Sequence, residues 1–124
     1  MTRPDWKTLL TPEQYRTLRL GETEPEYSGE YWHCEEEGMY TCAGCGQGLF
    51  SSADKFDGGC GWPTFAAPVE NQAVLEESDH SEGMDRIEIR CSACEGHLGH
   101  LFFDGPTDSG LRYCINSRAL VLEE

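Results

Sequence analysis

The chain has 124 residues, of which 38% are hydrophobic, and this size allows one domain with a modest core over residues 1–124. Its formal net charge of −14 gives a surface that repels phosphate backbones, which argues against a nucleic-acid-binding role. Residues 1–20 carry charges and no continuous apolar run, so we expect no signal peptide, no membrane span and a cytoplasmic location.

A short helix is predicted near the N-terminus. Thr11 suits the cap position, Pro12 the first helical position, and Gln14 completes a capping box. Gly21 suits the end of this helical segment. The Pro, Glu and Ser content of residues 22–29 then predicts a connecting loop.

The pattern changes after Gly38 to short apolar stretches separated by glycines, which is typical of a mainly antiparallel β domain. The clean alternation of residues 86–90 indicates a sheet with one face in water. The predicted strands cover residues 39–42, 87–91, 98–103, 111–116 and 119–122.

Four of the seven cysteines form two C-x-x-C pairs at the ends of predicted strands. This spacing allows two turns to present four thiolates to one tetrahedral Zn²⁺ and leaves no position for water, so the site is structural. An odd number of cysteines in a reducing compartment also fits poorly with a fully disulfide-bridged protein. We predict one Zn²⁺ per chain, held by Cys42, Cys45, Cys91 and Cys94.

A separate cysteine lies in one of the predicted strands. Residues two apart on a strand point the same way, so Arg112, Cys114 and Asn116 would share one face. A guanidinium beside a thiol favours the reactive thiolate, and an asparagine can orient a ligand. Cys114 is therefore a candidate nucleophile, and the alternative is a buried structural cysteine.

Two histidines three residues apart favour the functional interpretation of Cys114. A regular strand would send His97 and His100 to opposite faces, but Gly99 between them is suited to a bulge that turns both inward. Imidazoles there would donate hydrogen bonds or a proton near neutral pH. Zinc ligation is the alternative, although four cysteines already fill a tetrahedral site.

Cys60 lies between glycines, directly before Gly61-Trp62-Pro63. One interpretation is a mobile turn whose thiol swings toward another sulfur, with Trp62 as a rigid apolar wall. The other is a tight turn with an aromatic residue packed underneath. Composition alone does not distinguish the two.

Taken together, these segments closely resemble the methionine-R-sulfoxide reductase B family, in order and over essentially the whole chain from Gly38. The resemblance implies a β-sandwich of two antiparallel sheets. The matching segments are Tyr40-Thr41-Cys42, Leu49-Phe50-Ser51-Ser52, Lys55-Phe56-Asp57, Cys60-Gly61-Trp62-Pro63, His97-Leu98-Gly99-His100, Asp104-Gly105-Pro106 and Arg112-Tyr113-Cys114-Ile115-Asn116-Ser117.

The resemblance also implies an activity: an oxidoreductase that reduces the R epimer of methionine sulfoxide, free or within a protein, to methionine. Cys114 matches the catalytic cysteine, and Cys60 matches the resolving cysteine. Arg112 would assist the thiolate, and Trp62 would form the apolar wall for the substrate methyl group. The polar groups around the sulfoxide oxygen would be His97, His100 and Asn116, and the structural zinc ligands would be Cys42, Cys45, Cys91 and Cys94.

In this chemistry Cys114 becomes a sulfenic acid and then condenses with a nearby thiol to a disulfide, which an external dithiol such as thioredoxin reduces. Cys60 is the candidate partner, and Cys34 is either a relay or a peripheral packed thiol. No coiled coil or long apolar stripe is present, so a monomer is expected.

Two other classes of protein are compatible with parts of this pattern. A non-enzymatic zinc ribbon that binds a protein partner would use both C-x-x-C turns but would have no need for the Arg112, Cys114 and Asn116 face. A dithiol oxidoreductase of thioredoxin type would need a βαβ context that the glycine-rich setting does not offer.

Overall fold

The computed structural model describes residues 6–25, 29, 31–32, 36–56, 61–80, 86–105 and 109–123, without the side chains of Trp6 and Lys7. Two residues with predicted roles, Cys34 and Cys60, lie outside the described residues.

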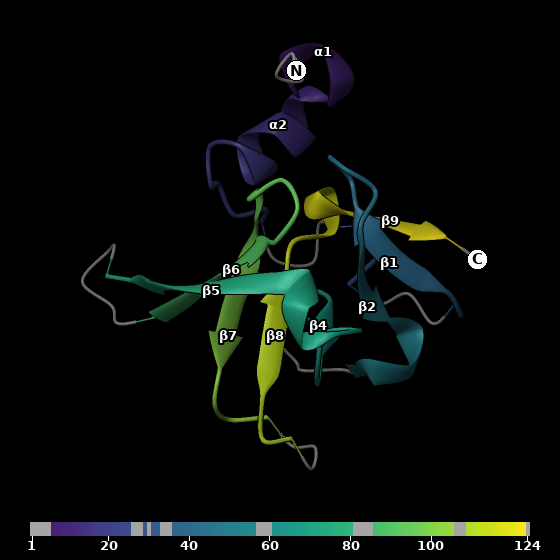
Figure 1. The fold of residues 1–124 in the computed structure, drawn as a ribbon, viewed down its shortest axis with the longest axis vertical. Helices are drawn as coiled ribbons and strands as arrows, with labels where there is room; N and C mark the ends of the chain where they lie inside the picture. The colour runs from purple at the N-terminus through teal and green to yellow at the C-terminus, as the bar shows by residue number, and fades with distance from the viewer. Residues whose placement is uncertain are drawn as a thin grey trace.

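Two short helices, α1 (Trp6–Leu9) and α2 (Pro12–Leu18), lie at one end of the molecule (Figure 1). The predicted capping box is present: Thr11 Oγ1 accepts a hydrogen bond from the Gln14 backbone N–H at 3.2 Å, and Gln14 Oε1 accepts one from the Thr11 N–H at 3.0 Å. Gly21 has a φ of 77° and donates its N–H to the Thr17 carbonyl. Glycine adopts this left-handed conformation without strain, and the chain turns here toward the sheets.

In the part of the chain that the structure describes, nine strands form two sheets in which every pair is antiparallel. The three-stranded sheet has the order β2 (Gly48–Ser51), β1 (Met39–Cys42) and β9 (Leu120–Glu123). The six-stranded sheet has the order β3 (Lys55–Phe56), β4 (Thr64–Phe65), β8 (Arg112–Ile115), β7 (His97–Phe102), β6 (Arg86–Cys91) and β5 (Val74–Asp79). Short 3₁₀ turns cover η1 (Ser52–Asp54), η2 (Asn71–Ala73) and η4 (Ser117–Ala119).

The core lies between the two sheets and is rich in aromatic side chains. Phe50 of the small sheet stacks on Phe65 of the large sheet with ring centroids 4.5 Å apart, and Tyr40 meets the same ring edge-on at 5.2 Å. Ile89 and Ile115 of the large sheet are fully buried in the same cluster. The predicted fold, mainly β with two antiparallel sheets and a short N-terminal helical segment, is confirmed.

The five predicted strands are all present within one residue of their expected ends. The pattern missed β2, β3, β4 and β5. β3 and β4 have two residues each, too few to show any periodicity. β5 is an edge strand whose middle residues are exposed on both faces, so its sequence lacks the alternation that signals a half-buried strand. Within the described residues, no helix has the length and apolar character needed to span a membrane.

The outer face of the large sheet is polar where the inner face is apolar. On β6, Arg86, Glu88 and Arg90 point outward, while Ile89 points into the core. Leu20 to Thr23, which follow α2, lie against this outer face and line a polar cavity with it. The large sheet therefore has one face that stabilises the fold and one that is available for chemistry.

Candidate active site and metal centre

The two C-x-x-C pairs form matching turns that extend from different sheets. Cys42 is the last residue of β1 in the small sheet, and Cys91 is the last residue of β6 in the large sheet. In each turn the first cysteine accepts a hydrogen bond from the backbone N–H four residues later, from Gly46 and Glu95 respectively. Both of these residues have positive φ, 82° and 61°. Among the described residues, Glu95 is the only one other than glycine with a positive φ. The backbone of the second turn is therefore more strained than that of the first.

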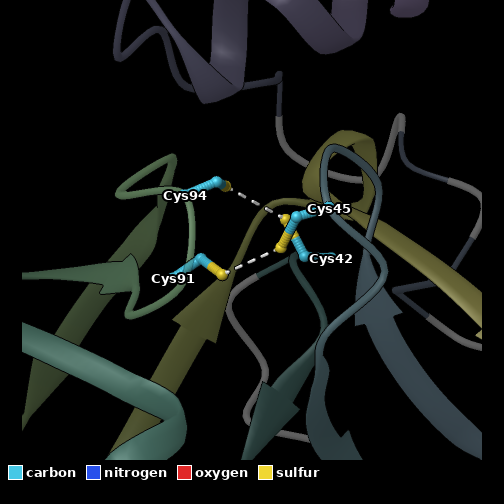
Figure 2. Close-up of side chains that lie close together, drawn as sticks. All are labelled: Cys42, Cys45, Cys91 and Cys94. Carbon is cyan, nitrogen blue, oxygen red and sulfur yellow. Dashed lines mark hydrogen bonds between the residues drawn. The ribbon is translucent and has the colours of Figure 1, made fainter. Parts of the chain in front are cut away.

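The four sulfur atoms converge between the sheets, as Figure 2 shows. The Sγ atoms of Cys42 and Cys94 are 3.7 Å apart, those of Cys45 and Cys91 are 3.5 Å apart, and all four lie within 4.8 Å of one another. A tetrahedral ion with Zn–S bonds of about 2.3 Å needs sulfur atoms about 3.8 Å apart. The site thus has both the ligands and the spacing for one such ion.

The protonation of these thiols also fits a cation. Hydrogen bonds with Cys91 and Cys94, together with burial, raise the pKa of Cys42, while the contact with Cys42 lowers the pKa of Cys94. Four thiols this close cannot all be thiolates unless a positive charge lies among them. The cluster therefore suits a metal that compensates several thiolates at once.

Cys114 lies on β8 with a guanidinium at its sulfur. It is 8% exposed, and Arg112 Nη1 donates a hydrogen bond to its Sγ at 2.9 Å. Asp104 fixes the guanidinium by accepting from Nε at 2.8 Å, and the Phe102 ring lies 4.4 Å from its central carbon. A positive N–H donor held at this distance favours the thiolate over the thiol.

A cavity of about 70 Å³ opens over Cys114. Trp62 and Phe102 provide apolar walls, and His100 and Asn116 add polar groups. The Trp62 indole is held in place because its Nε1–H donates to a backbone carbonyl at 2.9 Å. The structure therefore brings three of the predicted site residues, Trp62, His100 and Asn116, together around the Cys114 sulfur and places the guanidinium of a fourth, Arg112, beside it.

Strand register explains how His100 reaches this cavity. Glu77 pairs with Glu88, Glu88 with His100, His100 with Cys114, and Cys114 with Thr64. Residues directly opposite one another on neighbouring strands point to the same face of a sheet. His100 and Cys114 are therefore adjacent members of one row that crosses five strands.

His97 reaches the same face through the predicted bulge. The register shifts by one residue between Ile89 and Arg90 of β6, so that Arg90 pairs with His97 and Leu98 is the extra residue on β7. Leu98 consequently points into the core, while the rings of His97 and His100 meet edge-on with centroids 5.5 Å apart. Both histidines therefore turn to one side of the sheet, but the extra residue is Leu98 and not Gly99, where the bulge was predicted.

Gly99 is needed for space rather than for backbone freedom. Its φ is not in the left-handed region, but a Cβ at this position would collide with the Cys114 carbonyl oxygen and lie 2.9 Å from Ile115 Cα. Strands β7 and β8 thus approach closely at the nucleophile because residue 99 has no side chain.

Each histidine is held by a carboxylate that the sequence pattern did not identify. His97 Nδ1 lies 2.6 Å from Glu88 Oε2, and His100 Nε2 lies 2.7 Å from Asp79 Oδ2. A carboxylate accepts, so these ring nitrogens carry the protons. His100 lines both the Cys114 cavity and the neighbouring polar cavity, whereas His97 lines that polar cavity and a second one beside it but is not part of the Cys114 cavity wall. His100 is therefore nearer to the reacting position than His97.

The Asn116 side chain makes two backbone hydrogen bonds. Its Nδ2 donates to the Leu98 carbonyl at 3.0 Å, and its Oδ1 accepts from the Glu24 N–H at 2.9 Å. It is 3% exposed and still forms part of the cavity wall. Its amide orientation is therefore fixed by the protein.

Comparison with known proteins identifies the family. The SelR domain matches residues 10–124. A protein from Bradyrhizobium diazoefficiens is 56% identical over 118 residues, 95% of this chain and 85% of its own length, and one from Agrobacterium fabrum is 54% identical over 119 residues, 96% and 88%. One from Acinetobacter baylyi is 49% identical over 122 residues, 98% and 88%. All three are named peptide methionine sulfoxide reductase MsrB.

The chain belongs to the methionine-R-sulfoxide reductase B family. The predictions that it is an enzyme and an oxidoreductase are confirmed, and the zinc-ribbon module is not supported. In this family member, the residues that sequence reasoning missed are Asp79, Glu88 and Glu24. Asp104 belonged to a segment that carried the family resemblance, but the sequence gave no reason to place it beside Arg112.

The burial of His97 predicts a pH-dependent contribution to stability. Burial lowers the pKa of His97, and the neighbouring groups His100 and Arg90 lower it further. The hydrogen bond to Glu88 acts in the opposite direction, but the net shift is downward. The unfolded chain then binds a proton that the folded chain does not, so stability rises with pH and is lost as the pH falls below about 6.5. We expect His97→Asn to lose less unfolding free energy than the wild type between pH 7 and pH 5, by about 1 kcal/mol.

Urea denaturation at a series of pH values measures this difference. The exposed His80 is the matched control, because His80→Asn removes an imidazole without changing a buried one. Equal pH slopes for the wild type and His97→Asn would show that His97 does not titrate differently on unfolding.

Proposed function

We propose that this chain reduces the R epimer of methionine sulfoxide, free or protein-bound, to methionine. The observation that supports this most directly is the Arg112 N–H donated to Cys114 Sγ at 2.9 Å, at a cavity walled by Trp62 and Phe102. A thiolate is the reactive form of cysteine, and apolar walls suit the methyl and methylene groups of the substrate.

The first step transfers one oxygen atom. The Cys114 thiolate attacks the sulfoxide, the sulfoxide oxygen takes one proton, and the thioether departs as methionine with two more electrons on its sulfur. Cys114 is left as a sulfenic acid. His100 is the proton donor closest to the nucleophile, since it lines the same cavity and pairs with Cys114 across the strands. His97 and Asn116 support the polar surroundings of the oxygen.

The second step regenerates the thiol. Cys60 condenses with the sulfenic acid, which releases water and forms a disulfide, and a thioredoxin-like dithiol then reduces that disulfide by exchange. Trp62, two residues after Cys60 in the chain, lines the Cys114 cavity, which is consistent with a short path between the two sulfurs. Such recycling belongs to a reducing compartment such as the cytoplasm.

Cys42, Cys45, Cys91 and Cys94 would hold one structural Zn²⁺ that joins the two sheets. All four sulfurs would be occupied by the metal, so none of them would take part in the redox cycle. Residues 1–124 would act as a single catalytic domain and as a monomer.

The test of this function is epimer-resolved turnover. With dithiothreitol as reductant, we expect the chain to consume the R epimer of N-acetyl-methionine sulfoxide and to leave the S epimer unchanged, as measured by chiral chromatography. A thioredoxin system should replace dithiothreitol. Equal consumption of the two epimers would contradict the assigned substrate.

A further inference from the structure

Glu24 is a buried acid in the segment that follows α2, and it is bonded at three points. Its side chain and backbone are 1% exposed. The backbone N–H donates to Asn116 Oδ1 at 2.9 Å, and the backbone carbonyl accepts from Trp62 Nε1 at 2.9 Å. One carboxylate oxygen, Oε1, accepts from the Arg118 backbone N–H at 2.9 Å. One residue thus contacts two walls of the Cys114 cavity.

The first contact determines which way the Asn116 amide faces. An N–H group from Glu24 requires an oxygen opposite it, and the Leu98 carbonyl on the other side requires the NH₂ group. Turning the amide over would place donor against donor and acceptor against acceptor, which costs two buried hydrogen bonds. Asn116 can therefore offer the cavity an N–H donor, as a sulfoxide oxygen requires.

The second contact holds the indole. Trp62 Nε1 has a single hydrogen atom to donate, and the Glu24 carbonyl accepts it. The ring plane is thereby tied to the same residue that orients the amide. A shift of Glu24 would move the apolar wall and the polar wall of the cavity together.

The carboxylate anchors Glu24 against the turn that carries Asn116. Arg118 belongs to η4, which begins directly after Asn116. The other carboxylate oxygen, Oε2, is buried without a partner among the described residues, and a Cβ at Gly29 would collide with it and with Ser117 Oγ. Burying a carboxyl group with one of its oxygens unsatisfied destabilises the fold. Its presence is explained if the residue serves the site rather than stability.

We propose that Glu24 is a positioning residue of the Cys114 site, which sets the orientation of Asn116 and Trp62 toward the substrate. This inference rests on the proposed function, because it assigns the two side chains to the sulfoxide and its methyl group. The contacts that act on the thiolate are others: Arg112 hydrogen-bonds to Cys114 Sγ and is held by Asp104. Loss of the anchor is therefore expected to impair substrate positioning and to leave the nucleophile unchanged.

The experiment compares two substitutions of Glu24 in the full chain, with two measurements for each. We expect Glu24→Ala to lower kcat/KM for the R epimer by about 10- to 100-fold, since small misplacements of positioning groups have effects of this size. Glu24→Gln keeps an oxygen for the Arg118 N–H and should retain kcat/KM within about three-fold. The rate at which iodoacetamide alkylates Cys114, followed by mass spectrometry of its peptide, should be unchanged in both.

Glu22→Ala is the matched control, because it removes an exposed carboxylate two residues away. If Glu24→Ala does not fold, Glu24→Asp replaces it: the shorter side chain withdraws from Arg118, and we expect a loss of kcat/KM without a loss of alkylation. The proposal is overturned if the folded variant keeps wild-type kcat/KM, or if activity and Cys114 alkylation fall in parallel. A wild-type chain without sulfoxide reductase activity would instead refute the proposed function.

Discussion

Cys114→Ser should abolish the reduction of methionine-R-sulfoxide by dithiothreitol, with turnover falling by more than about 10³-fold. A serine hydroxyl keeps the size of the side chain but is not ionised by a guanidinium at neutral pH, and its oxygen cannot accept oxygen from the substrate. The fold should be retained, because the side chain touches the cavity and is not one of the four clustered cysteines. The measurement is turnover by chromatography, together with circular dichroism of the variant.

Comparison with Cys60→Ser separates the step at the nucleophile from the step that regenerates it. Dithiothreitol reduces a sulfenic acid directly, so this variant should keep dithiothreitol-driven turnover and lose mainly the thioredoxin-dependent cycle. Substantial dithiothreitol-driven turnover by Cys114→Ser would exclude Cys114 as the nucleophile. Loss of both cycles in Cys60→Ser would show that Cys60 does more than resolve the sulfenic acid.

Cys42→Ser is expected to cause the largest loss of stability in the chain. Structural zinc sites contribute roughly 10–16 kcal/mol of binding free energy, which is also folding free energy, whereas a domain of this kind has a net stability of about 5–15 kcal/mol. With one ligand removed, we expect a chain that binds no stoichiometric zinc and is largely unfolded at 25 °C. Metal analysis and a urea titration of the same preparation measure both properties.

The two cysteine substitutions control for each other. Cys114→Ser also removes one buried thiol, yet it should keep one zinc per chain and a wild-type unfolding midpoint. The zinc assignment would be wrong if Cys42→Ser remained fully folded without metal. The two sheets would then need no ion to stay together.

Local features of the fold were predictable because each depends on neighbours in the sequence. The capping box from Thr11 to Gln14 needs a spacing of three, and a C-x-x-C turn needs a spacing of three between sulfurs. The shared face of Arg112, Cys114 and Asn116 needs only a period of two. The bulge on β7 was predictable because two histidines flanked a glycine at a spacing that a regular strand does not use.

The partners of these residues were not predictable, because they depend on register between strands. Asp79 reaches His100 from an edge strand that the sequence did not reveal, and Glu88 reaches His97 only after the bulge has shifted the pairing. Glu24 lies in a polar segment whose composition indicates a loop, and its burial follows from contacts with residues about 90 positions later. A single sequence contains no periodicity that reports such contacts.

The extra residue on β7 allows one strand to place two leucines in the core and two histidines on the opposite face of the sheet. Leu98 and Leu101 fill the interior, and His97 and His100 lie on the opposite surface, although all four fall within five consecutive positions. In a regular strand of the same sequence, without the extra residue in the pairing, His97 and His100 would point to opposite faces, and one of the two imidazoles would point toward the hydrocarbon core. The placement of both imidazoles on one surface of the large sheet therefore depends on a local irregularity in the backbone of β7.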